Sequence, residues 1–299
     1  MKHCNLCGNA VNANEYRVFT RKNKPQSRGL TVCADCERTK PRCLVCQTPM
    51  RADRATMGIC GDCLREGLHC RSCGTKIRGE FLVVNGNDGP YCAKCYNTRA
   101  SCDLCGAPAG DGAVQMADGR IVCARCNATA IRDPREAETL FERVVDLLGN
   151  SLGMQLNIRP RLALVDHARL LELSRAAMED GHDSDKVLGL FMRQGQKRTI
   201  YLQEFLPRIL LIQVAAHEFA HAWQGEKCPL LRDPVLREGF AEWAAYHMLM
   251  QLDAQKKAAQ MLQRRDFYGD GLRQCLEIEK QQGIDGVLQF NRRSNSTSD

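Results

Sequence analysis

The chain has 299 residues, which is enough for two domains of ordinary size. Its formal charge of +7 originates in residues 1–130, where nineteen Lys and Arg outnumber eleven Asp and Glu. Zinc ions held by four thiolates each would contribute about −2 apiece and cancel that surplus, so the charge gives no support for a nucleic-acid partner.

Cysteines are concentrated in the first half of the chain. Sixteen of the 18 precede residue 127, and all sixteen occur as Cys-x-x-Cys pairs, which favours zinc binding over a disulfide framework. Thiolate ligands need a reducing compartment, and a chain that begins Met1-Lys2-His3-Cys4 leaves no room for a signal peptide. The longest apolar run is well short of the roughly 20 residues that cross a membrane. We therefore expect a cytoplasmic protein with no membrane partner.

Consecutive cysteine pairs predict four zinc modules, at about residues 1–40, 41–67, 68–99 and 100–130. Six residues separate the last cysteine of each module from the first of the next, a spacing typical of a repeat. Each module is too small for a hydrophobic core, so a structural zinc ion is expected to supply its folding energy. The expected ligand sets are Cys4, Cys7, Cys33 and Cys36; Cys43, Cys46, Cys60 and Cys63; Cys70, Cys73, Cys92 and Cys95; and Cys102, Cys105, Cys123 and Cys126.

One alternative pairing would share a site across a gap, as in Cys33, Cys36, Cys43 and Cys46. The histidines beside the cysteine pairs, His3 and His69, are expected to be surface residues because four thiolates complete a site.

A hairpin followed by a short helix is predicted inside the modules. In the third module, residues 76–84 and the glycine turn 85–89 precede a helix that opens at Cys92, and residues 114–123 repeat the pattern in the fourth. These segments resemble the treble-clef halves of LIM domains, although LIM proteins join their two halves by only about two residues.

Helical periodicity begins after Cys126. Asp133 and Pro134 open a predicted helix that continues to Leu148. A strand at 161–166, a helix at 167–178 and two strands at 188–192 and 199–203 follow, so we expect a small antiparallel sheet.

The next segment predicts a long helix that carries an HExxH motif. Residues 206–214 are mainly apolar, and no helix breaker occurs before Gly225. Residues four apart share one face of a helix, so His217 and His221 can bind one metal ion. Glu218 would face a water on that metal and act as the general base.

A second long helix, from Pro234 to about Gln251, supplies the expected third ligand. Sixteen residues separate Glu238 from His221, and Glu238 would complete a two-histidine, one-glutamate site with one open position. Glu242, one turn further on, is expected to accept a hydrogen bond from the other ring nitrogen of a ligand histidine. The reverse assignment, with Glu242 as the ligand, is an alternative.

HEFAHAW and EGFAEW together are similar to the gluzincin metallopeptidases. A closer resemblance is to the LIM-containing, ubiquitin-activated peptidases of plants that restrain organ growth. Those proteins also have cysteine-pair modules, HExxHxW, a glutamate after the same interval and a Tyr-Gly-Asp-Gly segment. The matching residues here are His217, Glu218, His221, Trp223, Glu238 and Tyr268 to Gly271.

This resemblance runs from about Cys70 to Phe290 and implies a zinc-dependent endopeptidase that cuts a few regulatory protein partners. The plant proteins carry ubiquitin-interacting motifs ahead of their zinc modules. This chain starts at the first cysteine pair, so we expect ubiquitin activation not to carry over, and ubiquitin or a ubiquitin-like protein is a partner on the resemblance alone. The short architecture is that expected of a bacterial relative.

The predicted fold is therefore α+β. Treble-clef or LIM-like zinc modules occupy residues 1–130, a mainly helical gluzincin-like peptidase domain occupies 131–290, and 291–299 form a disordered tail. One catalytic and about four structural zinc ions are expected, with the modules serving partner binding or regulation.

The oxyanion stabiliser is the least specified part of the predicted site. Tyr268 is the first candidate, followed by Tyr246 and His247 on the second helix. Cys228 is expected to be an ordinary thiol. Two rival functions remain: an aminopeptidase, because residues 176–180 superficially resemble the amine-binding segment of such enzymes, and a zinc-module adaptor whose metal fold is not catalytic.

Overall fold

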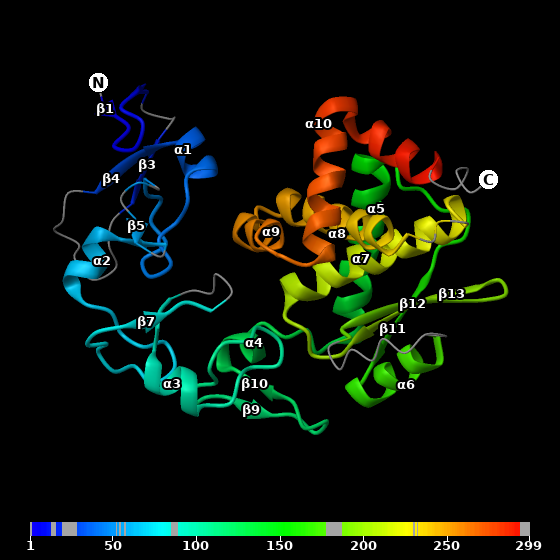
Figure 1. Ribbon diagram of the computed structural model, residues 1–299, viewed down its shortest axis with the longest axis horizontal. Helices are drawn as coiled ribbons and strands as arrows, with labels where there is room; N and C mark the ends of the chain where they lie inside the picture. The colour runs from blue at the N-terminus through cyan, green and yellow to red at the C-terminus, as the bar shows by residue number, and fades with distance from the viewer. Residues whose placement is uncertain are drawn as a thin grey trace. The chain divides into compact units, whose positions relative to one another are not determined.

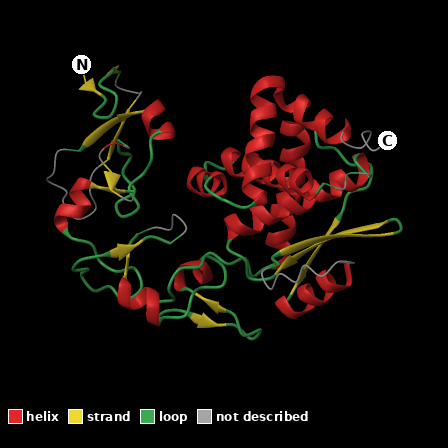
Figure 2. Cartoon of the chain, in the orientation of Figure 1, coloured by secondary structure: helices red, strands yellow, loops and turns green. Residues whose placement is uncertain are grey.

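The computed structural model describes residues 2–12, 16–19, 29–51, 53, 55–56, 58–84, 89–177, 187–229, 231 and 233–293. The chain forms two compact units, Met1–Val114 with Ile121–Cys123, and Gln115–Arg120 with Ala124–Asp299. Short strands and one- to two-turn helices make up the modules, whereas long helices dominate the second unit (Figures 1 and 2). Within the described residues, no helix has both the length and the apolar character that a membrane span requires.

The four cysteine modules share one local plan. Each consists of a loop around its first cysteine pair, a two-stranded hairpin and a short helix that carries the last cysteine. The first module has a second small hairpin as well. The elements are β1 (Lys2–His3), β2 (Ala10–Val11), β3 (Tyr16–Phe19), β4 (Leu30–Cys33) and α1 (Ala34–Thr39); β5 (Ala55–Thr56), β6 (Ile59–Cys60) and α2 (Gly61–Glu66); β7 (Phe81–Leu82), β8 (Tyr91–Cys92) and α3 (Ala93–Thr98); and β9 (Val114–Gln115), β10 (Ile121–Val122) and α4 (Ala124–Ala128).

Each first cysteine pair lies in a tight turn. In the first module the Gly8 N–H donates to the Cys4 carbonyl at 2.8 Å, and Gly8 has a φ of 82°. Glycine is favoured there because a side chain is strained in this left-handed region. The second module departs from the pattern, since Gln47 occupies the equivalent position with a φ of 61°.

Small apolar clusters connect neighbouring modules. Leu68 and Ile77 pack on the cluster around Cys43 and Ile59, so residues on both sides of the second gap share one core. Ala107 of the fourth module packs in the same way into the cluster of the third. Leu68 belongs to the second six-residue gap, so that gap itself contributes a side chain to a shared core, which a zinc module of this size needs for stability.

The second unit is mainly helical. Asp133 caps α5 (Pro134–Leu152) by accepting a hydrogen bond from the Arg135 N–H at 2.9 Å, and the helix ends before Gly153, whose φ is 67°. The elements that follow α5 are β11 (Arg161–Val165), α6 (His167–Ala177), β12 (Gly189–Gln194), β13 (Lys197–Gln203), α7 (Arg208–Lys227), α8 (Pro234–Gln251), α9 (Gln255–Leu262) and α10 (Phe267–Arg293).

Three strands form a mixed sheet in the order β11-β13-β12. β12 and β13 make the predicted antiparallel hairpin, which turns at Gly195. β11 runs parallel to β13, however, so the sheet that was predicted to be antiparallel is mixed. The chain leaves β11 through α6 before it enters the hairpin, and this long connection allows the parallel pairing.

The core of the second unit lies where α7, α8 and α10 meet. The Trp223 ring of α7 stacks on Phe240 of α8 with centroids 5.1 Å apart, and Phe240 lies 5.4 Å from Trp243. All three are fully buried. The expected helix at 207–224 begins at Arg208, after Pro207, and extends through Gly225 to Lys227, and the second runs from Pro234 to Gln251 as predicted.

The C-terminal helix extends into the predicted disordered tail. Asn291 is fully buried, its side-chain amide donates to the Val287 carbonyl at 3.1 Å, and α10 continues to Arg293. The first three residues of the predicted disordered tail therefore belong to the fold, and 294–299 lie outside the described residues.

Candidate metal centres

Four groups of cysteines bring their sulfur atoms together. Each group is one of the sequential sets predicted from the sequence, so the alternative of a site shared across a gap was wrong for the described residues. The closest recorded Sγ–Sγ distances, such as Cys46 to Cys60, are 3.8 Å, far from a bonded disulfide at about 2.0 Å. Sulfurs about 2.3 Å from a tetrahedral zinc ion lie about 3.8 Å apart. The geometry is that of four-thiolate zinc sites.

The electrostatics of these groups favour the binding of a cation. The Cys46 hydrogen bond lowers the pKa of Cys43 to about 6, and the same contact raises the pKa of Cys46 to about 12. Burial raises the pKa of Cys63 further above its ordinary value. Four thiols so close together cannot all ionise by themselves, whereas a divalent cation would hold all four as thiolates.

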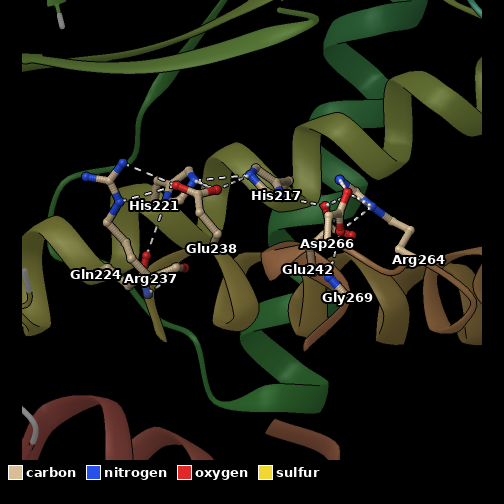
Figure 3. Close-up of polar contacts among 9 residues, drawn as sticks. All are labelled: His217, His221, Gln224, Arg237, Glu238, Glu242, Arg264, Asp266 and Gly269. Carbon is tan, nitrogen blue, oxygen red and sulfur yellow. Dashed lines mark hydrogen bonds and ion pairs between the residues drawn. The ribbon is translucent and has the colours of Figure 1, made fainter. Parts of the chain in front are cut away.

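A fifth group joins α7 and α8. The Nε2 atoms of His217 and His221 lie 3.1 Å apart, and the Glu238 Oε2 lies 3.2 and 3.3 Å from them (Figure 3). Nitrogen and oxygen ligands about 2.0–2.1 Å from a tetrahedral zinc ion are about 3.3–3.4 Å apart. These three atoms therefore outline one face of such a site and can hold a metal ion.

Both histidine rings have an acceptor for their second nitrogen. The His221 Nδ1 lies 3.1 Å from the Gln224 Oε1, and the His217 Nδ1 faces the Glu242 Oε1 at 3.5 Å. Carbonyl and carboxylate oxygens accept only, so with a cation at the centre of the group each Nδ1 would carry the proton and each Nε2 would offer its lone pair to the cation. Glu242 thus lies on the outer side of the His217 ring, and Glu238 faces both Nε2 atoms.

The charge balance of the His217, His221 and Glu238 group is strongly perturbed. Burial opposes protonation of His217, but the hydrogen bond to Glu238 and the carboxylates of Glu218 and Glu242 outweigh it and raise the pKa of His217 to about 9. Burial opposes ionisation of Glu238, and the two histidines overcome it and hold the pKa of Glu238 well below its usual range. Three buried carboxylates around two imidazoles favour a cation at their centre.

Glu218 is anchored to the edge of the sheet. It follows His217 in α7, is buried, and its Oε2 accepts a hydrogen bond from the Phe191 N–H of β12 at 2.8 Å. A methyl group added at Gly189 of β12 would lie 2.8 Å from the Glu218 Cγ and 2.5 Å from the Val214 Cγ1. Gly189 therefore permits the close approach of β12 to α7 that this hydrogen bond needs.

Two arginines complete the surroundings of the group. Arg237 directs its Nε and Nη2 to the Glu238 Oε1, at 3.3 and 3.2 Å, which leaves Oε2 for the histidines. Arg264 donates to the Glu242 Oε1 at 3.2 Å. The sequence prediction missed both arginines and Gln224. Gln224 could have been found, because it lies one turn beyond His221 on the same helix.

The three candidates for an oxyanion stabiliser lie in different surroundings. The half-buried Tyr268, in the first turn of α10, has its ring centroid 6.4 Å from that of His217. His247 instead pairs with Glu279 of α10 at 2.8 Å. Tyr246 and His247 line a different cavity, of about 440 Å³, together with Met250, Leu276, Glu279 and Lys280. Tyr268 is therefore the one of the three that lies beside the group.

Residues 176–180 suggested an aminopeptidase. Ala176 and Ala177 are the last residues of α6, and residues 178–180 lie outside the described residues. Cys228 is buried, in keeping with an ordinary thiol.

Comparison with protein-family models, with curated proteins and with solved structures gave no match to this chain.

Proposed function

We propose that this chain is a zinc-dependent endopeptidase that cleaves selected protein partners. The observation that carries the proposal is the convergence of the His217, His221 and Glu238 ligand atoms within 3.1–3.3 Å of one another, next to a buried glutamate in the same helix. Three protein ligands with an open fourth position are typical of catalytic zinc, whereas the four-cysteine groups are closed.

A zinc ion held by these three residues would act as a Lewis acid toward a scissile carbonyl and would lower the pKa of a nearby water. Glu218 moves the protons. Its Oε2 is occupied by the Phe191 N–H, so Oε1 is the atom that accepts a proton from the attacking water and delivers it to the leaving amine. The phenolic hydroxyl of Tyr268 is the candidate donor to the developing oxyanion.

Endopeptidase activity is favoured over aminopeptidase activity by the position of the site. β12 is an edge strand of the three-stranded sheet, and Glu218 is bonded to it. An extended segment from the middle of a polypeptide can add to such an edge.

We further propose that the cysteine modules are LIM-like treble clefs that bind a protein partner or regulate cleavage. Two observations support this. Each module consists of a tight turn at its first cysteine pair, a hairpin and a short helix, and apolar clusters are shared between neighbouring modules. Within the proposal the chain is related to the LIM-containing peptidases of plants and works in the reducing cytoplasm, where thiolate ligands persist.

Glu218→Gln tests the catalytic part of the proposal. The zinc-loaded full chain is incubated with casein and with itself, and the new termini are mapped by mass spectrometry. Internal cleavage should be lost in Glu218→Gln, with the zinc content unchanged, because the amide cannot accept the proton.

The control is Glu277→Gln, which neutralises an exposed glutamate of α10 and should leave cleavage intact. Undiminished cleavage by Glu218→Gln would refute the mechanism. Release of single N-terminal residues would indicate an aminopeptidase, and no cleavage by the unmodified chain would favour the adaptor.

A further inference from the structure

Arg264 lies at the junction of α9 and α10, outside every motif that the sequence suggested. Its Nη1 donates to the Glu242 Oε1 at 3.2 Å, and the same oxygen faces the His217 Nδ1 at 3.5 Å. Arg264, Glu242 and His217 therefore form a chain from the α9–α10 junction through α8 to α7 (Figure 3).

Glu242 makes both of these contacts through the same oxygen, Oε1. Its side chain is only 7% exposed, and Oε2 is buried with no hydrogen-bond partner among the described residues. Burying a carboxylate is costly unless a cation pairs with it and its position is well defined. Arg264 provides that pairing, on the oxygen that serves His217.

Arg264 is itself held from two sides. Asp266 receives its Nη2 at 2.8 Å and its Nε at 3.1 Å, and the guanidinium carbon lies 4.5 Å from the centroid of the Tyr268 ring. Asp266 is fixed in turn, because its Oδ1 accepts the Gly269 N–H at 3.1 Å. A planar guanidinium can make these contacts together, whereas a lysine ammonium cannot reproduce the fork.

We propose that Arg264 is a positioning residue of the metal site, acting through Glu242 to hold the His217 ring in its ligand orientation. The inference rests on the proposed metal site. Outer partners of metal-bound histidines typically change metal affinity by about 10- to 100-fold when they are lost. Arg264 extends that support by one further residue and connects the site to the segment that carries Tyr268.

The test measures zinc per full-length chain across a series of buffered Zn²⁺ concentrations. His221→Ala supplies the baseline of a chain without the fifth site. Gln224→Ala, which removes the acceptor of His221, shows the size of the loss when a direct outer partner is missing. Arg264→Gln should weaken binding of the fifth zinc by about 10-fold or more, and Arg264→Lys should weaken it less because the charge beside Glu242 is retained.

Two controls separate positioning from general stability. Arg265→Gln removes the same charge from the adjacent exposed position. Arg273→Gln loosens the same segment, since Arg273 donates to the Leu262 and Arg264 carbonyls at 2.8 and 2.9 Å and not to Glu242. Both should retain the fifth zinc.

Each alternative result has a definite meaning. An unmodified chain that binds no more zinc than His221→Ala would refute the metal site, and with it the proposed function. A fifth zinc that Arg264→Gln leaves unchanged would overturn the role of Arg264 alone. Equal losses in Arg264→Gln and Arg264→Lys, or an equal loss in Arg273→Gln, would indicate packing rather than positioning by charge and would also overturn it.

Discussion

Two glycines determine how closely α8 approaches the start of α10. A methyl group added at Gly239 would lie 2.5 Å from the Cα of Gly271, and one added at Gly271 would lie 2.5 Å from the Val235 carbonyl oxygen. Gly239 directly follows Glu238, so this contact also affects the third candidate ligand. Gly239→Ala is therefore a sensitive perturbation of both the fold and the site.

The expected magnitude follows from two opposing terms. Overpacking in a well-packed interior costs about 1–3 kcal/mol, and the upper end applies here because the opposing atoms are backbone and cannot change rotamer. Alanine recovers about 1 kcal/mol relative to glycine inside a helix. A net loss of about 2 kcal/mol in unfolding free energy would lower the melting temperature of a unit of this size by about 4–8 °C.

Tryptophan fluorescence is the appropriate assay. Both tryptophans of the chain, Trp223 and Trp243, are fully buried in the second unit, so a thermal melt followed by their emission reports that unit. Displacing the backbone beside Glu238 should also reduce binding of the fifth zinc, which is measured on the same samples.

The matched control is Gly225→Ala in α7, where the new methyl group would lie 3.5 Å from the Phe191 ring, an ordinary contact. This variant should melt at or above the temperature of the unmodified chain. If Gly239→Ala does the same and keeps its fifth zinc, the glycine contact does not determine the helix packing and the reasoning is wrong.

Two further predictions concern the cysteines. Cys4→Ser should lower the zinc content by one ion per chain and leave the tryptophan melt unchanged, because the apolar cluster around Cys4 contains residues of the first module and both tryptophans lie in the other unit. Loss of several ions, measured by elemental analysis, would contradict an independent first site. Burial raises the pKa of Cys228 to about 11 and that of Cys275 to about 12, so their thiolate fraction at pH 8 is about one thousandth or less. Iodoacetamide should therefore label neither Cys228 nor Cys275 in the zinc-loaded chain at pH 8, and peptide mapping should show faster labelling of Cys228 as the pH rises toward 11. Rapid labelling of either cysteine at pH 8 would contradict their burial.

Local patterns predicted the parts whose geometry is local. In each module the first Cys-x-x-Cys pair forms a tight turn and the second begins the helix, and both structures involve only neighbouring residues. Each of the four ligand sets combines two consecutive pairs. His217 and His221 share a face of α7 because of the helical period, and Asp233 and Pro234 define the start of α8. The apolar runs were sufficient to place these helices.

Other parts of the site depend on contacts between distant segments. Phe191 bonds Glu218 across 27 residues and Arg264 bonds Glu242 across 22, and no periodicity relates these positions. The parallel pairing of β11 with β13 was missed because strand direction depends on the path of the connection. His247 was expected near the site because it lies on α8, but its side chain contacts Glu279 of α10 instead.

The sequence by itself determined which residue types can bind metal and on which helices and turns they lie, because spacing of a few residues dictates which side chains share a face. Only the tertiary structure decided which carboxylate oxygen faces the histidines and which arginines hold the two glutamates. Those choices depend on how α7, α8 and α10 pack, and Gly239 and Gly271 permit that packing by leaving out a side chain where two backbones meet.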